Sequence, residues 1–125
     1  MPLERPTIEK PAGDLPFDLG VEDIVVGDGD EAARGHKVTV HYAGIAFRTG
    51  EEFDASWNRG EPFRFALGKG QVIPGWDQGV AGMRVGGRRK LTIPSALAYG
   101  ARGAGNGVIA PHEPLVFVVD LLAVD

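Results

Sequence analysis

Short β-type segments, most of them separated by glycine-containing turns, run along most of this 125-residue chain. The clearest is HKVTVHYAGIAF, in which Val38, Val40 and Tyr42 alternate with Thr39 and His41. An alternation with a period of two is typical of a strand with one face buried and the other in solvent. Turn signals occur at RTGE, NRGE, GKGQ and RVGGR. The pattern therefore predicts a sheet of several short strands, with His41 on a solvated face.

Five further segments are predicted to form strands on the same grounds. In chain order they are EDIVVGDGD, EEFDAS, EPFRFAL, RRKLTIP and EPLVFVVDLLAVD. The last of them is rich in β-branched and apolar residues, which suits a central strand that finishes the chain.

One segment, from Val72 to Met83, is predicted to be helical. Pro74 would stand in its first turn, where the missing N–H of proline costs nothing. Gly75 and Gly79 are poor helix formers, each about 1 kcal/mol worse than alanine, so such a helix forms only if packing holds it. Because these glycines are four residues apart, they share one thin face that another element can approach closely. Several strands with one short helix predict an α+β fold, an antiparallel sheet with one face against a helix.

Residues 1–20 differ in composition from the rest, because they hold four of the nine prolines. Proline fixes φ and lacks an N–H, so a regular helix is not expected there. We predict an extended, proline-rich tail over residues 1–20 and a folded domain over residues 21–125. Leu15, Phe17 and Leu19 could lay an apolar edge on the domain. The prolines and the lack of pattern predict that deleting residues 1–14 leaves activity and melting temperature nearly unchanged.

The composition is that of a single globular domain, 43% hydrophobic and 24% charged. A net charge of −4 argues against nucleic acid or an anionic membrane as a partner. Cysteine is absent, so the chain has no disulfide framework. No apolar run approaches the roughly 20 residues of a membrane span, and residues 1–20 lack the apolar stretch of a secretory signal. We therefore expect a cytoplasmic protein.

The common catalytic and cofactor motifs do not occur in the sequence. Neither Ser56 nor Ser95 lies in G-x-S-x-G, and the glycine-rich stretches GARGAGNG and LGKGQ match neither dinucleotide nor phosphate-loop spacing. The histidines lack partners at metal-ligand spacing, so we predict no metal and no cofactor. A carboxylate pair for glycoside hydrolysis stays open among Glu51, Glu52 and Asp54, although neighbours on a strand point to opposite faces.

Aromatic residues form the remaining candidate group. Seven of the ten are Tyr42, Phe53, Phe63, Phe65, Trp76, Tyr99 and Phe117. A hydrophobic core and a ligand pocket lined by aromatic rings with a few polar groups give the same pattern in a sequence. The residues alone therefore leave core and pocket open, and Asp54 equally suits a turn at the end of a strand.

The segments VTVHYAG, FDAS, PFRFALGKGQVIPGWDQGVAGM, VGGRRKLTIPSALAYGARG and PLVFVVDLL occur in this order along the chain. With them, the chain from about residue 21 to residue 125 resembles the FKBP-type peptidyl-prolyl cis-trans isomerases. The resemblance implies a curved antiparallel sheet wrapped around one short helix, with the site between them. The residues that match the family's pocket are Tyr42, Phe53, Asp54, Arg59, Phe63, Val72, Ile73, Trp76, Tyr99, Ile109 and Phe117.

The resemblance implies an enzyme that accelerates rotation about X–Pro peptide bonds and so assists protein folding. Such a reaction needs no nucleophile, because the amide isomerises through a twisted state over a barrier of about 18–20 kcal/mol. The twisted amide is less polar than the planar one, so an aromatic pocket favours it more than water does. By resemblance, Trp76 forms the floor for the proline ring, while the Ile73 N–H and the Tyr99 hydroxyl hold substrate carbonyls.

The resemblance also assigns the polar groups of the pocket. Asp54 would face the twisting carbonyl, with Tyr42 and Arg59 fixing its side chain. The expected partners are proline-containing polypeptides and macrolides such as rapamycin and tacrolimus, and the expected state is a monomer. A binding module of the same fold, which holds a partner or a macrolide without useful catalysis, stays open as a second class.

Three features depart from the pattern of the family's short eukaryotic members. The loop between Tyr99 and Phe117 is slightly longer, and it has Ala104 where those members often carry histidine. Gln71 stands where an acidic residue is common. The family's contact at that position is largely through the backbone, so we give Gln71 little weight.

Overall fold

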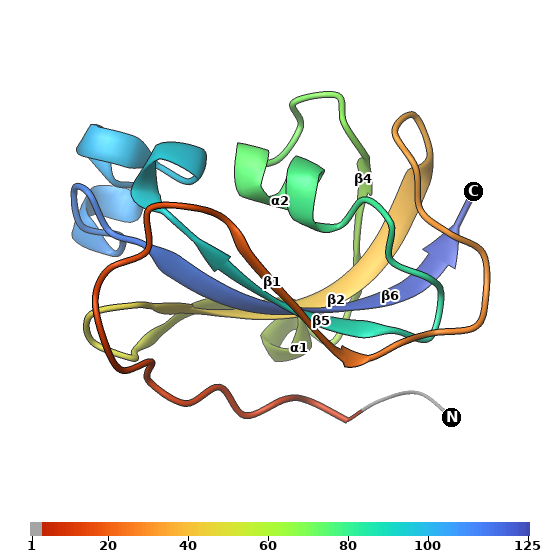
Figure 1. Cartoon of the computed structure of the whole chain (residues 1–125), viewed down its shortest axis with the longest axis horizontal. Helices are drawn as coiled ribbons and strands as arrows, with labels where there is room; N and C mark the ends of the chain where they lie inside the picture. The colour runs from red at the N-terminus through yellow and green to blue at the C-terminus, as the bar shows by residue number, and fades with distance from the viewer. Residues whose placement is uncertain (1–3) are drawn as a thin grey trace.

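The computed structural model describes residues 4–125, apart from the side chain of Asn106. Within them, six strands form one antiparallel sheet of order β1-β5-β6-β2-β3, and β4 also pairs with β2. The strands are β1 (Gly20–Val25), β2 (Lys37–Ala46), β3 (Glu52–Ala55), β4 (Phe63–Ala66), β5 (Arg88–Ile93) and β6 (Leu115–Val124). Figure 1 shows the sheet curving beneath helix α2 (Pro74–Gly79). This arrangement confirms the predicted α+β fold.

The two longest strands, β2 and β6, lie side by side in the middle of the sheet. Strand β6 is thus central, as predicted. The expectation that β2 has a solvated face is wrong, because Thr39 is buried and His41 is half-buried. A short helix behind the sheet, α1 (Ser56–Arg59), covers this face. The His41 ring stacks on Trp57 with centroids 4.2 Å apart, and its Nδ1 lies 2.7 Å from the Ser56 hydroxyl.

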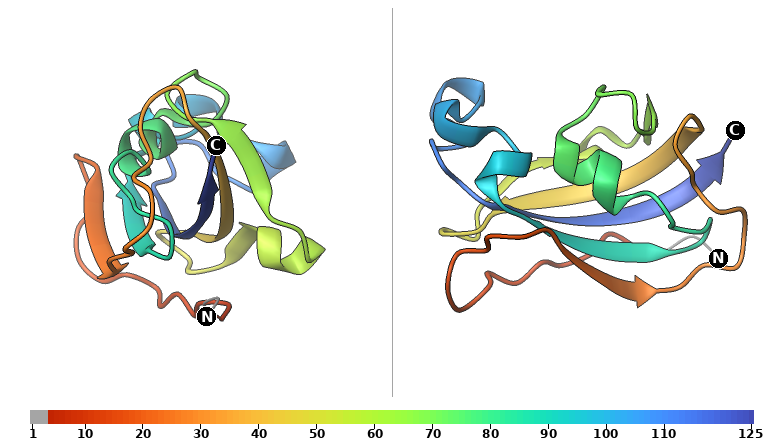
Figure 2. Two further views of the ribbon diagram at one scale, coloured as in Figure 1. Left: turned by 90° about the vertical axis from the view of Figure 1, so that its right-hand side faces the viewer. Right: turned by 45° about the horizontal axis from the view of Figure 1, so that its top comes forward.

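Helix α2 lies on the concave side of the sheet, opposite α1 (Figure 2). It begins with Pro74 at its first position, as predicted, but it ends at Gly79 and not at Met83. Gly82 has a φ of 90°, a left-handed conformation in which the helix cannot continue. Within residues 4–125, no helix is long and apolar enough to cross a membrane.

The predicted thin face of α2 is confirmed, and strand β5 is the element that approaches it. A Cβ atom added to Gly75 would lie 2.5 Å from Cγ2 of Ile93, and one added to Gly79 would lie 2.6 Å from Cδ2 of Leu91. Real Cβ atoms do not come so close, so the two glycines allow the helix to pack directly on the sheet.

The glycine-rich connection between β5 and β6 is folded locally into 3₁₀ turns. These are η1 (Ser95–Leu97), η2 (Gly100–Arg102) and η3 (Gly105–Gly107). Ala104 and Ile109 form a bridge with hydrogen bonds of 3.0 Å in both directions. The turns gather at one end of the sheet (Figure 1).

The N-terminal segment runs without regular structure along the back of the sheet, on the side away from α2 (Figures 1 and 2). Ile8 packs against a small buried cluster of Ile45, Phe47 and Val116. Arg88 donates a hydrogen bond to the Glu4 carbonyl. These contacts tie the segment to the sheet.

The apolar residues just before β1 behave differently from one another. Leu19 packs against the main core. Leu15 is 40% exposed and Phe17 is 94% exposed. Of these three residues, only Leu19 therefore forms an apolar edge against the domain.

Candidate active site

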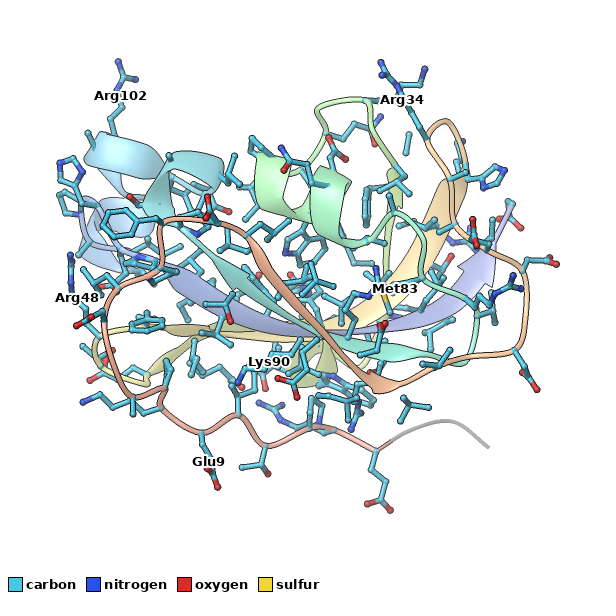
Figure 3. The ribbon with its side chains drawn as sticks, in the orientation of Figure 1. Glu9, Arg34, Arg48, Met83, Lys90 and Arg102 are labelled. Atoms are coloured by element: carbon cyan, nitrogen blue, oxygen red, sulfur yellow. The ribbon has the colours of Figure 1, made fainter. Side chains whose placement is uncertain are left out.

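A pocket of about 180 Å³ opens between α2 and the sheet. Its lining residues are Tyr42, Phe53, Asp54, Phe63, Gln71, Val72, Ile73, Trp76, Tyr99 and Phe117. All the predicted site residues except Arg59 and Ile109 line it. Side chains from the helix and the sheet fill the space between these two layers around it (Figure 3).

The Trp76 side chain from α2 is held by rings that rise from the sheet. It is 4% exposed, so it belongs to the core and to the pocket at once. The Tyr42 ring from β2 lies 4.9 Å from it at 78°, and the Phe117 ring from β6 lies 5.2 Å from it at 86°. Edge-to-face pairs of this kind fix the orientation of each ring. The pocket is therefore shaped before a ligand arrives.

Phe53 and Asp54 both line the pocket although they are neighbours on β3. Asp54 pairs with Gly44 while Glu52 pairs with Ile45, so Phe53 is an extra residue on its strand. Such a bulge breaks the alternation of side chains and re-aims one of them. The bulge explains how consecutive residues reach one site.

Gly44 is a site residue that the sequence reasoning missed. It pairs with Phe117 on one side and with Asp54 on the other. A Cβ atom added there would lie 2.6 Å from Cε1 of Phe117 and 2.8 Å from Cζ of Phe53. Because Gly44 has no side chain, the rings of Phe117 and Phe53 can lie directly over the strand. In the sequence, the sign of such a close approach is a glycine inside a β-type segment.

Asp54 is the ionisable group at the centre of a three-residue network. Its Oδ2 accepts a hydrogen bond of 2.5 Å from the Tyr42 hydroxyl. Its Oδ1 accepts one of 2.8 Å from Arg59, which is also an ion pair. A second Arg59 nitrogen donates to the Tyr42 oxygen at 2.8 Å. Both carboxylate oxygens therefore have donors that fix the plane of the group.

Two tyrosine hydroxyls at the pocket are held in their protonated form. Burial raises the pKa of Tyr42, and its hydrogen bond to Asp54 raises it further. Burial likewise raises the pKa of Tyr99, with an added contribution from the negative charge of Asp54. Tyr99 is nevertheless 41% exposed, so its hydroxyl can meet a ligand. At neutral pH both groups keep their protons; the Tyr42 proton is donated to Asp54, and the Tyr99 hydroxyl is the donor that can face a ligand.

The pocket lining differs from the expected set at three residues. Arg59 does not line the pocket, but it contacts Asp54 and Tyr42 as the resemblance implies. Ile109 is buried in the core, packed under the β5–β6 connection through its bridge to Ala104. Gln71 lines the pocket, and its Oε1 accepts the Ala66 N–H at 2.8 Å. Its side chain therefore helps to shape the wall.

Among residues 4–125, no group of three or more His, Cys, Asp or Glu side chains could hold a metal ion. The chemistry offered by the described pocket is that of aromatic rings, one carboxylate oriented by Tyr42 and Arg59, and the Tyr99 hydroxyl as a donor.

Comparison with known proteins places the sequence and the fold in context. The sequence profile of the FKBP-type peptidyl-prolyl cis-trans isomerases matches residues 29–122. An FK506-binding protein of Streptomyces anulatus is 63% identical over 124 residues, which is 99% of this chain and 100% of that protein. The peptidyl-prolyl cis-trans isomerase FPR2 of Saccharomyces cerevisiae is 55% identical over 106 residues, 85% of this chain and 75% of that one.

Solved structures show the same similarity. The crystal structure of AtFKBP13 superposes with a TM-score of 0.79 and 42% identity, over 86% of this chain and 94% of that one. FkpA from Escherichia coli superposes with a TM-score of 0.78 and 41% identity, over 86% of this chain and 48% of that one.

Proposed function

The chain belongs to the FKBP-type peptidyl-prolyl cis-trans isomerase family, and we propose that its isomerase activity resides in the aromatic pocket between α2 and the sheet. The main observation behind this proposal is that an apolar, preformed pocket contains one carboxylate, that of Asp54. Both of its oxygens accept hydrogen bonds, from Tyr42 and Arg59. A planar X–Pro amide is well solvated by water, whereas the twisted amide has lost resonance and is less polar. Transfer into the pocket therefore favours the twisted state.

The walls of the pocket suit a proline ring. Trp76 lies at the base between Tyr42 and Phe117, and a flat proline ring stacks on such a surface without polar partners. The Tyr99 hydroxyl, protonated and partly exposed, donates a hydrogen bond to a carbonyl of the bound peptide. The backbone N–H of Ile73, at the start of α2, holds a second carbonyl. These two donors would align the substrate along the pocket.

In this proposal Asp54 orients and polarises the substrate amide, and it does not remove a proton from it. Tyr42 and Arg59 hold its oxygens in one plane, so its charge faces the carbonyl of the rotating amide in a fixed direction. A charge placed in advance needs no reorganisation when the amide twists. No metal, nucleotide or covalent intermediate takes part.

Macrolide binding belongs to the same proposal. The relatives described above include one protein named for binding FK506, which is tacrolimus. We expect tacrolimus and rapamycin to occupy the pocket of this chain and to compete with proline-containing polypeptides. We also propose a cytoplasmic location and a monomeric state in dilute solution, which cell fractionation and sedimentation velocity test.

A protease-coupled assay tests the activity. The purified protein is mixed with a short peptide that has an apolar residue before proline, and the slow cis-to-trans phase is followed with and without a chelator. We expect acceleration that the chelator does not change. A rate equal to the uncatalysed one, with folded protein, would leave only a binding module.

A further inference from the structure

Pro16 lies in an unusual setting near the N-terminus. Within the described residues it is the only proline with a large apolar side chain on each side, Leu15 before it and Phe17 after it. Phe17 is also the most exposed large hydrophobic residue of that part of the chain, at 94%. We call residues Leu15–Phe17 the LPF segment. Its side chains contribute little to the core, so folding alone does not account for them.

The LPF segment is held away from the pocket of its own molecule. After it, Gly20 pairs with Thr92 as the first residue of β1. Before it, Ile8 is packed on the back of the sheet. The segment itself lines a separate cavity of about 350 Å³ beside η1. It therefore stands as a loop at the end of the molecule where the 3₁₀ turns lie (Figure 1).

We propose that the LPF segment of one molecule binds in the aromatic pocket of a second copy of this chain. The proposal rests on the proposed function, because it gives that pocket an X–Pro segment as its ligand. The Pro16 ring would stack on Trp76 of the second copy. Leu15 and Phe17 would place their exposed side chains against the surrounding aromatic walls. Burying these side chains on binding removes apolar surface that the single molecule leaves in water.

Charge supports the same orientation. The LPF segment lies between Asp14 and Asp18, which are both exposed. The two loops that carry pocket residues present the exposed bases Lys69 and Arg102, and Arg102 extends from the surface in Figure 3. Opposite charges therefore surround the contact and guide the approach. Each copy has a net charge of −4, which opposes association and makes the contact weak.

This contact is head to tail, since a loop of one molecule meets a pocket of the next. The contact is heterologous, because it joins two different surfaces. One molecule keeps a free pocket and the other keeps a free LPF segment, and the amount of the complex depends on the protein concentration. It also competes with substrate for the pocket. The activity per molecule should therefore fall as the protein becomes concentrated, which is a form of self-inhibition in trans.

Nuclear magnetic resonance with mixed samples tests the contact in the full chain. Isotope-labelled Phe17→Ser protein keeps the pocket but lacks the most exposed side chain of the LPF segment. It is titrated with unlabelled wild type to about 1 mM, where contacts of millimolar dissociation constant are populated. We expect the amide signals of Ile73 and Tyr99 to shift progressively. Unlabelled Phe17→Ser protein should cause no such shift. Val26→Ser, which alters another exposed apolar residue (75%), should act like wild type.

The outcomes separate this proposal from the function on which it rests. Absence of pocket shifts with unlabelled wild type, or equal shifts with unlabelled Phe17→Ser, would overturn the self-recognition. The peptide assay on dilute enzyme judges the isomerase site by itself. An active enzyme whose pocket signals do not move would refute the LPF contact alone, whereas pocket shifts in an inactive protein would support the contact and refute the catalytic proposal.

Discussion

Asp54 shows at the scale of one residue how the pocket combines apolar walls with a single charge. Its two oxygens have different donors, the Tyr42 hydroxyl at 2.5 Å and the Arg59 guanidinium at 2.8 Å. The sequence offered Asp54 equally as a strand-end turn residue. Its network depends on residues 5 and 12 positions away in the chain, which local pattern does not reveal.

The Asp54→Asn variant tests whether this charge orients or transfers a proton. Asparagine keeps the shape but loses the charge, and its amide nitrogen must face one of the two donors. A charge-assisted hydrogen bond contributes about 1.5–3 kcal/mol, so kcat/KM should fall about 10- to 100-fold without reaching the uncatalysed rate. The control is Glu61→Gln, at an exposed position outside the pocket lining. Complete loss of activity in a well-folded variant would indicate proton transfer.

The raised pKa values of Tyr42 and Tyr99 lead to a prediction of how stability and activity depend on pH. Burial raises the pKa of Tyr42 and Tyr99 above the ordinary value of about 10, so the folded state holds these protons more tightly than the unfolded chain. Their contribution to stability is therefore present below about pH 10 and is lost as the pH rises toward the raised pKa values. A protease-free assay should give a flat kcat/KM from about pH 7 to 9. An apparent pKa inside that window would contradict this assignment.

At the scale of elements, the contact between α2 and β5 determines how close the pocket floor lies to the sheet. The Gly79→Ala substitution gains about 1 kcal/mol in helix propensity but forces a methyl group into Leu91. Overpacking costs about 1–3 kcal/mol, so we expect a net loss of stability in urea unfolding. Gln78→Ala, on the exposed side of the helix, is the matched control. A Gly79→Ala protein more stable than wild type would contradict the close packing.

The elements were predicted unequally well, for physical reasons. Alternation and turn signals located all six described strands, because these are local properties of the chain. The end of α2 was misplaced, since a left-handed Gly82 has the same letter as a helical Gly79. Helix α1 and the bulge at Phe53 were not predicted, because both depend on pairing with β2. The choice between core and pocket needed the family resemblance.

At the scale of the whole molecule, the N-terminal segment takes part in the fold more than its composition suggested. Ile8 covers a small cluster on the back of the sheet, and Arg5 donates hydrogen bonds to Glu52 and Asn58, which flank the Asp54 network in the chain. The proline content predicted that the N-terminal segment is extended. Its docking could not be predicted, because it depends on the apolar surface that the folded sheet presents to Ile8. Removal of the segment should therefore not be neutral.

The Ile8→Ala variant measures this docking. A fully buried isoleucine truncated to alanine costs about 2–5 kcal/mol. Ile8 is only half-buried, so we expect a loss below that range, about 1–2 kcal/mol in the free energy of unfolding. Thr7→Ala, one residue earlier and exposed, should change stability by less than about 0.5 kcal/mol. If the Ile8→Ala and Thr7→Ala proteins were equally stable, the contact of Ile8 would not stabilise the fold, and the segment would be a loose tail.

The central claim is that one aromatic pocket, organised by the whole sheet and α2, performs the isomerisation. Titration of the isomerase activity with rapamycin tests it most directly, with binding followed independently by calorimetry. We expect activity to fall in proportion to the fraction of protein bound and to reach the uncatalysed rate at saturation, with more macrolide needed when the peptide concentration is raised. Activity that persists in fully saturated protein would contradict the assignment of catalysis to this pocket.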